Sequence, residues 1–476
     1  MKKALILFIA SLPLASFAQN EVDALRYSML NYQGGTARFS GMGSSFGALG
    51  GDFSSIGVNP ACLGIYRKPE FTFTPSLFTQ STGSTFNGSV NSDSKMNFNF
   101  SNVGIVFAHA EHGDEQEWKG VGFSFGYTGL SNFNNRINIS GISDSSSLLD
   151  IYQSNAYSQN DPNTLDPFGA QLAWNTWLID TLTAGNYYHV IPNYGQNVSK
   201  TVESRGTMGE TFFAIAGNYA NKLFIGGSFG LPHIRYVEES TYSESVQNDT
   251  VFNLESYTLK QNLTTTGAGF NVKLGVIFKP VDFIRIGGSF HSPSMLEMTD
   301  TYNSKMESHF TSNDYSSESP DGAFDYTITT PLRLTGSLGV IIKKFAAINV
   351  DYEYVDYSSS RLSAPFENFT DANAAIRAKY TSAGTLRVGA EFKLAPLSLR
   401  AGYAMSDSPY KPGVNDGKRN TLSFGFGIRE KNTFIDFAYV MSETTEDYYM
   451  YDPKLIAPAS LNSKATNYQL TAGFKF

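Results

Sequence analysis

Six charged residues in the C-terminal part of the chain are spaced so that they can form ion pairs along one face of a sheet. They alternate with apolar residues, as in the segment from Leu386 to Phe392. In a β-strand this alternation puts apolar side chains on one face and charged side chains on the other. The six residues are Asp351, Glu353, Arg387, Glu391, Arg400 and Arg429. Opposite charges on successive segments predict cross-strand ion pairs, which either stiffen a wall or bind a ligand.

Motifs for metal, nucleotide or enzymatic chemistry are weak. His109 and His112 are close enough in sequence to share a metal ion, but no third ligand at a suitable spacing accompanies them. Gly41, Gly43 and Gly47 resemble a phosphate-binding loop only loosely, because no strand precedes them. We therefore expect no metal site, no cofactor and no enzymatic activity, although a catalytic triad is assembled by the fold and not by spacing. The net charge of −8 argues against a nucleic-acid partner.

The last ten residues predict a strand with one apolar and one polar face. From Asn467 to Phe476, apolar residues occupy alternate positions, and the chain ends on an aromatic side chain. Such a strand spans a bilayer only in a closed barrel, where every backbone group is paired; the alternative is an edge strand of a soluble sandwich. A terminal Phe after this pattern is typical of bacterial outer-membrane proteins, and we expect Phe476 to contact the barrel-assembly machinery.

The first residues are typical of a secretory signal peptide. Met1-Lys2-Lys3 is basic, Ala4–Leu14 is apolar, and Ser16-Phe17-Ala18 provides small residues for cleavage after Ala18. The apolar stretch is too short for a spanning helix. The single cysteine of the exported chain, Cys62, has no internal disulfide partner.

Composition and connector lengths favour a membrane barrel of about fourteen antiparallel strands over a sandwich. Charged residues are 16% of the chain, below the ~25% of ordinary soluble domains, and aromatic residues are 14%. Short connectors such as 343–345 and 430–432 alternate with long ones such as Ser131–Gly209 and Thr299–Ala323. Short periplasmic turns and long extracellular loops produce this rhythm. In strands where apolar and charged residues alternate, the charged side chains cannot face lipid. We therefore expect the six charged residues to line the lumen.

Three regions do not follow the strand pattern. The segment from Gln19 to about Tyr66 is rich in small residues, and Asp23–Asn31 within it predicts one short helix. Helical spacing is also present in two long connectors, at Leu165–Tyr188 and at Asp371–Tyr380, where Thr370 is the expected N-cap. The apolar connector should fold over or into the lumen, since an unpacked apolar loop would face water.

Several short motifs, taken in their order and spacing, resemble the long-chain fatty-acid transporter (FadL/TodX) family. They are Asn59-Pro60-Ala61, Asp351-Tyr352-Glu353-Tyr354, Leu386-Arg387-Val388-Gly389-Ala390-Glu391-Phe392, Leu399-Arg400-Ala401-Gly402-Tyr403 and the terminal Phe476. The resemblance implies a signal peptide over residues 1–18, a lumenal hatch over 19–68, and a fourteen-stranded outer-membrane barrel over 69–476. This chain departs from the family in its very long connector Ser131–Gly209. The ligand-binding loop residues of the family therefore cannot be assigned to positions in this sequence.

The resemblance implies passive uptake of hydrophobic molecules, such as fatty acids or aromatic hydrocarbons, across the outer membrane of a Gram-negative bacterium. The expected partners are then the hydrophobic ligand and outer-membrane lipid. The alternative is a barrel that holds exported proteins, as family relatives in secretion systems do. Candidate ligand-lining residues are Leu25, Met29, Trp174, Trp177 and Leu178, which otherwise only pack the plug. Exit of a ligand needs a break in the sheet, and the glycines of the third strand, from Gly120 to Gly129, mark the weakest segment.

Overall fold

The computed structural model describes residues 20–30, 34–110, 117–246 and 251–476. The signal peptide with its cleavage after Ala18, and His112 of the histidine pair, lie outside the described residues.

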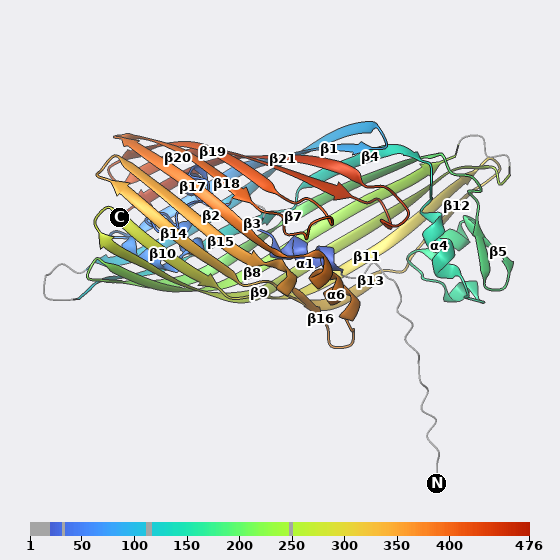
Figure 1. The fold of residues 1–476 in the computed structure, drawn as a ribbon, viewed down its shortest axis with the longest axis horizontal. Coiled ribbons are helices and arrows are strands. Elements are labelled where there is room, and N and C mark those ends of the chain that lie inside the picture. The colour runs from blue at the N-terminus through green and yellow to red at the C-terminus, as the bar shows by residue number, and fades with distance from the viewer. Residues whose placement is uncertain (1–19, 31–33, 111–116, 247–250) are drawn as a thin grey trace, which may run out of the picture.

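Fourteen strands pair antiparallel in chain order and close into a barrel, which confirms the predicted fold class (Figure 1). The wall strands are β1 (Glu70–Phe86), β2 (Ser89–Ala110), β3 (Trp118–Asn132), β7 (Gln196–Tyr219), β8 (Leu223–Ser245), β9 (Leu254–Val281), β10 (Ile284–His291), β14 (Arg333–Ile342), β15 (Ala346–Asp356), β17 (Ser382–Leu394), β18 (Leu397–Ser406), β19 (Arg419–Glu430), β20 (Thr433–Tyr448) and β21 (Ala459–Lys475). The barrel closes between β1 and β21, for example where Phe71 pairs with Phe474.

Further strands extend the wall on the side of the long connectors. They are β4 (Asn135–Ser143), β11 (Met295–Phe310), β12 (Asp314–Glu318), β13 (Gly322–Thr329) and β16 (Arg361–Ser363). Each of β10 and β14 is separated from its extension by a short segment containing a proline, Pro293 or Pro331. Proline has no N–H to donate to a ladder, so both strands are interrupted at these points.

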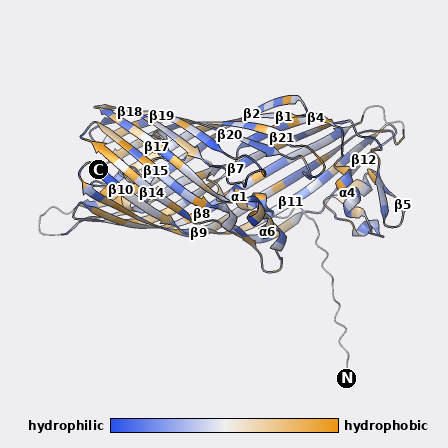
Figure 2. Cartoon of the chain, viewed as in Figure 1, coloured by the Kyte–Doolittle hydropathy of each residue, from blue (hydrophilic) through white to orange (hydrophobic). Residues whose placement is uncertain are grey.

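The outer face of the wall is apolar along the part of the barrel that faces lipid. On β9, Phe270, Val272 and Leu274 are exposed, whereas Asn271 and Lys273 between them are buried. Figure 2 shows hydrophobic residues gathered at the end of the barrel near the C-terminus and more hydrophilic strands toward the opposite end. Among the described residues, no helix has the length and apolar character needed to cross a bilayer.

Short helices form most of the N-terminal segment. They are α1 (Glu21–Ser28), α2 (Ala37–Gly41), α3 (Ser55–Val58) and the 3₁₀ helix η1 (Pro60–Ile65). The helix expected at Asp23–Asn31 begins two residues earlier, because Asn20 caps it and Asp23 bonds back to the Asn20 N–H.

The longest connector forms an extracellular cap with α4 (Leu149–Ala156), η2 (Pro162–Thr164), α5 (Ala170–Asn175), β5 (Ile179–Thr183) and β6 (Asn186–His189). The expectation of helix through Leu165–Tyr188 is correct only for α5. The following residues form a hairpin whose turn contains Gly185 at a φ of 77°. Thr181 and Thr183 favour the strand conformation, and glycine accepts the left-handed turn.

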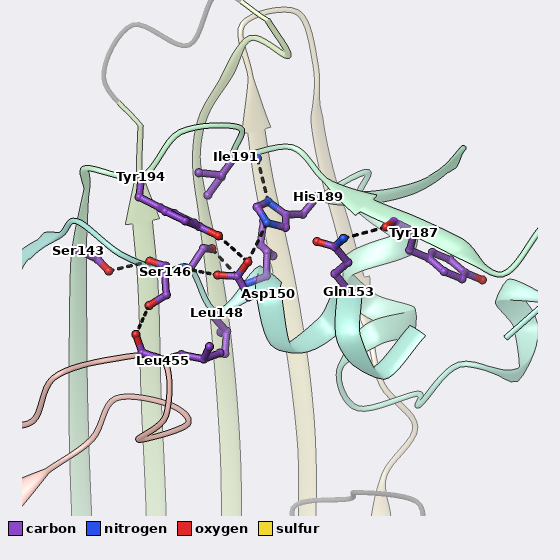
Figure 3. Close-up of polar contacts among 12 residues, drawn as sticks. Ser143, Ser146, Leu148, Asp150, Gln153, Tyr187, His189, Ile191, Tyr194 and Leu455 are labelled. Atoms are coloured by element: carbon purple, nitrogen blue, oxygen red, sulfur yellow. Dashed lines mark hydrogen bonds and ion pairs between the residues drawn. The ribbon is translucent and has the colours of Figure 1, made fainter. Parts of the chain in front are cut away.

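Polar contacts fix the cap in place (Figure 3). Asp150 of α4 lies 3.0 Å from Nε2 of His189 and accepts a 2.8 Å hydrogen bond from the Tyr194 hydroxyl. Ser146 donates to the Leu455 carbonyl oxygen at 2.7 Å, which links the cap to the connector before β21. The helix expected at Asp371–Tyr380 is α6 (Thr370–Lys379), preceded by the 3₁₀ helix η3 (Tyr357–Ser359).

Candidate functional site

The N-terminal segment is hydrogen-bonded to buried side chains of several wall strands. The Ala37 N–H donates to Thr471 of β21 at 2.7 Å, and the Gly43 N–H donates to Ser423 of β19 at 2.9 Å. The carboxylate of Asp351 on β15 accepts the N–H groups of Phe46 and Gly47 at 2.9 and 3.1 Å. Because these strands lie at different positions around the barrel, the segment occupies the lumen.

Asn59-Pro60-Ala61 contacts the wall through its side chains and backbone. The Asn59 amide donates to the Gly47 carbonyl at 2.8 Å and to the Val276 carbonyl of β9 at 3.2 Å, while its oxygen accepts the Ala61 N–H. A Cβ at Gly275 would lie 2.0 Å from the Asn59 oxygen. The motif therefore caps η1 and joins the segment to a place where the wall has no side chain.

Glu391 is the centre of a buried charge cluster between the wall and the N-terminal segment. It is 1% exposed and accepts hydrogen bonds from Arg38 at 2.8 and 2.9 Å and from Arg400 at 2.7 Å. Arg400 also donates to Asp436 at 2.6 Å. Charge-assisted, two-point contacts of this kind fix geometry strongly.

The other charged residues predicted for the lumen have different surroundings. Glu353 is shared by Arg387 at 3.2 Å and Arg333 at 3.3 Å. Arg429 is exposed, and its guanidinium lies 4.7 Å from the centre of the Phe434 ring. Among the residues that the structure describes, Arg429 and Asp351 make no ion pair, whereas the other four do. Asp351 accepts backbone N–H groups of the N-terminal segment instead.

A cavity of about 140 Å³ lies between the N-terminal segment and the wall. Its apolar lining comes from Tyr27, Leu30 and Phe39 on the segment and from Leu130 and Met208 on the wall. Both proline interruptions of the wall border it, through Ser292 and Ser294 on one strand and Thr330 and Pro331 on the next.

The cavity also has a charged side. Its lining includes the cations Lys273, Arg333 and Arg387 and the carboxylates Glu210 and Glu353. Lys273 pairs with Glu210, and both arginines share Glu353. Cations therefore exceed carboxylates by one in this lining, which suits an acidic group on an apolar ligand.

The wall has a break beside this cavity. The ladder between β2 and β3 ends where Asn102 pairs with Thr128, and β3 is irregular between Gly129 and Ser131. Beyond that point Ser89–Ser101 of β2 pairs with β1 but with no other strand among the described residues. Thr128, Gly129 and Leu130 line the cavity, so the cavity reaches the break.

Charged side chains cross the break. Lys95 of β2 donates to Glu203 of β7 at 2.7 Å, and Arg136 of β4 donates to the same carboxylate at 2.8 Å. Asn91 of β2 donates to the Ser140 hydroxyl of β4 at 3.0 Å. The break is therefore spanned by side chains where backbone pairing ends.

The five candidate ligand-lining residues fall in two separate places. Leu25 and Met29 belong to an apolar cluster around α1, next to the cavity-lining Tyr27. Trp174 and Leu178 belong to the apolar cluster of the extracellular cap, and Trp177 is 54% exposed beside Tyr315. None of the five is part of the cavity lining. A role in ligand binding for them stays a prediction.

The alternation of apolar and charged residues along the strands could have predicted several of the residues that line the cavity. Lys273 lies between Val272 and Leu274, and Arg333 lies between Leu332 and Leu334, in the same pattern that identified Arg387. Leu130 and Met208 have no such signal, because they lie where the strand pattern is irregular.

The fold and the lumenal segment define a class: a bacterial outer-membrane β-barrel whose N-terminal residues occupy its lumen. A sequence model of the family described as outer membrane protein transport protein (OMPP1/FadL/TodX) matches residues 208–474. This match covers more than half of the chain, and the chain belongs to that family. It is accordingly an outer-membrane protein of a Gram-negative bacterium. Comparison with curated protein sequences gives no match.

Solved structures with the same fold include several transporters. A Pseudomonas aeruginosa FadL homologue is 13% identical, with a TM-score of 0.55 over 93% of this chain and 98% of its own. The Pseudomonas putida toluene transporter TodX is 13% identical, with a TM-score of 0.54 over 94% and 99% of the two chains. The Ralstonia pickettii toluene transporter TbuX is 15% identical, with a TM-score of 0.51 over 94% and 100%. At these identities the likeness concerns the fold.

Proposed function

We propose that this protein takes up hydrophobic molecules passively across the outer membrane, through the lumenal cavity and the break between β2 and β3. The observation that carries this proposal is the continuity between the two, since Gly129 and Leu130 belong to both. The family description and the toluene transporters among the similar folds support it.

The lining of the cavity favours a hydrophobic acid, such as a long-chain fatty acid, over a plain aromatic hydrocarbon. Burial of an apolar chain against Tyr27, Leu130 and Met208 gains about 25 cal/mol per Å² of area removed from water. Arg333 and Arg387 share one carboxylate, so an acidic group beside them meets a net positive charge. A hydrocarbon leaves these groups without a new partner.

The exit route leads sideways into the membrane. A closed barrel has no unpaired edge, whereas Ser89–Ser101 of β2 has one. Phe98 and Phe100 on this stretch are exposed on the outer face, 59% and 51% respectively. A hydrophobic molecule leaving the cavity at Leu130 therefore reaches apolar surface without crossing the periplasmic end.

The N-terminal segment acts as the plug, the signal peptide is removed after Ala18, and the plug extends over residues 19–68. The buried contacts of Arg38, Phe46 and Asn59 with the wall support this division of the chain. The plug keeps ions from passing while leaving the cavity open toward the break.

Uptake by cells tests the proposal. A host without its own fatty-acid transporter should accumulate a radiolabelled long-chain fatty acid faster with the protein than with an empty vector. Labelled toluene, tested in parallel, should show a smaller gain. If neither molecule enters faster, the transport proposal is wrong and a barrel that holds exported proteins becomes the better explanation. A gain for toluene alone would contradict only the preference for acids.

A further inference from the structure

A polar hollow of about 450 Å³ lies on the extracellular side of the barrel, apart from the cavity and the break. One wall is a face of α6 that presents Thr370, Asn373 and Arg377, which are spaced three and four residues apart. The facing wall is η3 and the residue Arg361, with Asn368 at the rim. No aspartate or glutamate belongs to the lining of the hollow.

The two arginines of the hollow have no acidic partner. Arg361 and Arg377 are both exposed, and neither guanidinium makes an ion pair or a hydrogen bond with a residue that the structure describes. The Ser358 hydroxyl, in contrast, already donates to the Asp356 carboxylate at 2.6 Å, and the Ser359 hydroxyl donates to the Asp356 backbone carbonyl at 2.7 Å. The lining of the hollow therefore offers hydrogen-bond donors and two positive charges, and the neighbouring carboxylate of Asp356 is already engaged by Ser358.

The N-terminus of α6 adds to this character. The helix has ten residues, begins at Thr370 in the wall of the hollow, and has no side-chain cap. Its first N–H groups and its dipole favour a negative charge nearby. Asp371 lies in the first turn but does not line the hollow, so it does not occupy the place of an anion there.

The position of the hollow matches the head groups of the outer leaflet. On β15, Tyr352 and Tyr354 are exposed on the outer face, 52% and 41%, and η3 begins three residues after Tyr354. Aromatic residues of this kind mark the membrane interface of bacterial barrels. Figure 1 shows α6 and β16 projecting sideways from the wall. The other side of α6 packs against α1, where Lys379 pairs with Glu21.

We propose that this hollow binds a phosphate group of a phosphorylated glycolipid, lipopolysaccharide, in the outer leaflet. The planar guanidinium fork matches phosphate oxygens, and two such forks with an uncapped helix N-terminus provide the donors that three oxygens require. The hollow borders the cavity at one point, where the hydroxyl of Ser360 lies 3.3 Å from that of Ser28, but neither Arg361 nor Arg377 lines the cavity. A test on the two arginines therefore does not depend on transport.

Binding of lipid A to the purified full-length protein tests this inference. Native mass spectrometry would follow titration with bisphosphorylated lipid A for the wild type, for R361Q and R377Q singly, and for both together. R235Q is the matched control, because Arg235 is also exposed, on the outer face of β8, but lies outside the hollow. A heat-modifiability gel verifies that each variant is folded.

The expected result is binding by the wild type that weakens at least tenfold in the double variant and changes less than twofold in R235Q. Inorganic phosphate should compete with lipid A, and dephosphorylated lipid A should bind as weakly as lipid A binds to the double variant. Equal binding by wild type and double variant would overturn the proposal, as would equal binding of the dephosphorylated lipid. An equal loss in R235Q would show general charge attraction in place of a site and would overturn it as well.

Discussion

Arg38 of the N-terminal segment and Glu391 of β17 form a two-point ion pair inside the barrel, with nitrogen–oxygen distances of 2.8 and 2.9 Å. The Arg38 side chain is 11% exposed and the Glu391 side chain 1%. A charge that is buried is stable only when it is paired and hydrogen-bonded. The pair therefore fixes the segment against the wall at one defined place.

Replacing Glu391 by glutamine should destabilise the protein by about 3–5 kcal/mol, because Arg38 and Arg400 would lose their shared carboxylate while remaining buried. The measurement is the temperature at which the folded form disappears in a heat-modifiability gel. E443Q is the control, since the Glu443–Lys464 pair is exposed and should contribute little. An equal effect in both variants would show that the buried cluster has no special role.

Deletion of residues 20–57 should raise ion conductance of the barrel in planar bilayers several-fold. The deleted residues fill the lumen between β15, β19 and β21, and water would take their place. The variant retains Asn59 and its contact with β9. Conductance equal to that of the full-length protein would mean that the segment does not obstruct the pore.

Glu203 pairs with cations on both sides of the break, and we expect it to set how firmly the break is closed. Its substitution by glutamine removes the charge shared by Lys95 and Arg136, so the break should open more readily and fatty-acid uptake should rise about two- to fivefold, on the order of 0.5–1 kcal/mol. E318Q breaks the exposed Lys305–Glu318 pair between β11 and β12, away from β2, β4 and β7, and should leave uptake unchanged. Slower uptake in E203Q would indicate that the ion pair positions the ligand.

The extracellular cap should loosen in acid. Burial alone would raise the pKa of Asp150, but hydrogen bonds from His189, the Ser147 N–H and Tyr194 hold that pKa below its ordinary value. The stabilisation is therefore present above the ordinary carboxyl pKa and is lost as pH falls through the lower, folded pKa. Limited proteolysis of the connector between β4 and β7 should accelerate below about pH 4. D150N should show faster cleavage at neutral pH and a weaker dependence on pH.

Much of the barrel could be predicted from the sequence because each wall strand repeats one rule. Alternation on β15, β17, β18 and β19 fixes which residues face lipid, and the same rule places Asp351 and Glu391 inside. The turn between the first two wall strands also follows a local rule. Asn87-Gly88, with φ angles of 44° and 84°, is the turn that joins β1 and β2, and this dipeptide is a strong hairpin signal.

The cavity could be predicted only in part, because it is assembled from segments that are far apart in sequence. Alternation identifies Lys273 and Arg387 as lumenal, but it does not indicate that Tyr27 and Leu130 approach them. Apolar character alone favoured Trp174 and Leu178, and the structure places Leu178 in the apolar cluster of the cap with Trp174 packed against it. The arrangement of the long connector depends on that tertiary packing, and local sequence does not encode it.

Uptake of a radiolabelled long-chain fatty acid by cells carrying L130W is the decisive test of a route through the cavity and the break. Leu130 lines the cavity beside the break, and a tryptophan there would occupy much of the space of about 140 Å³. L231W is the matched control, because Leu231 is exposed on the outer face of β8. L130W should lower uptake at least tenfold while L231W resembles the wild type, with both proteins folded and equally abundant. Wild-type uptake by folded L130W would contradict a route through this cavity.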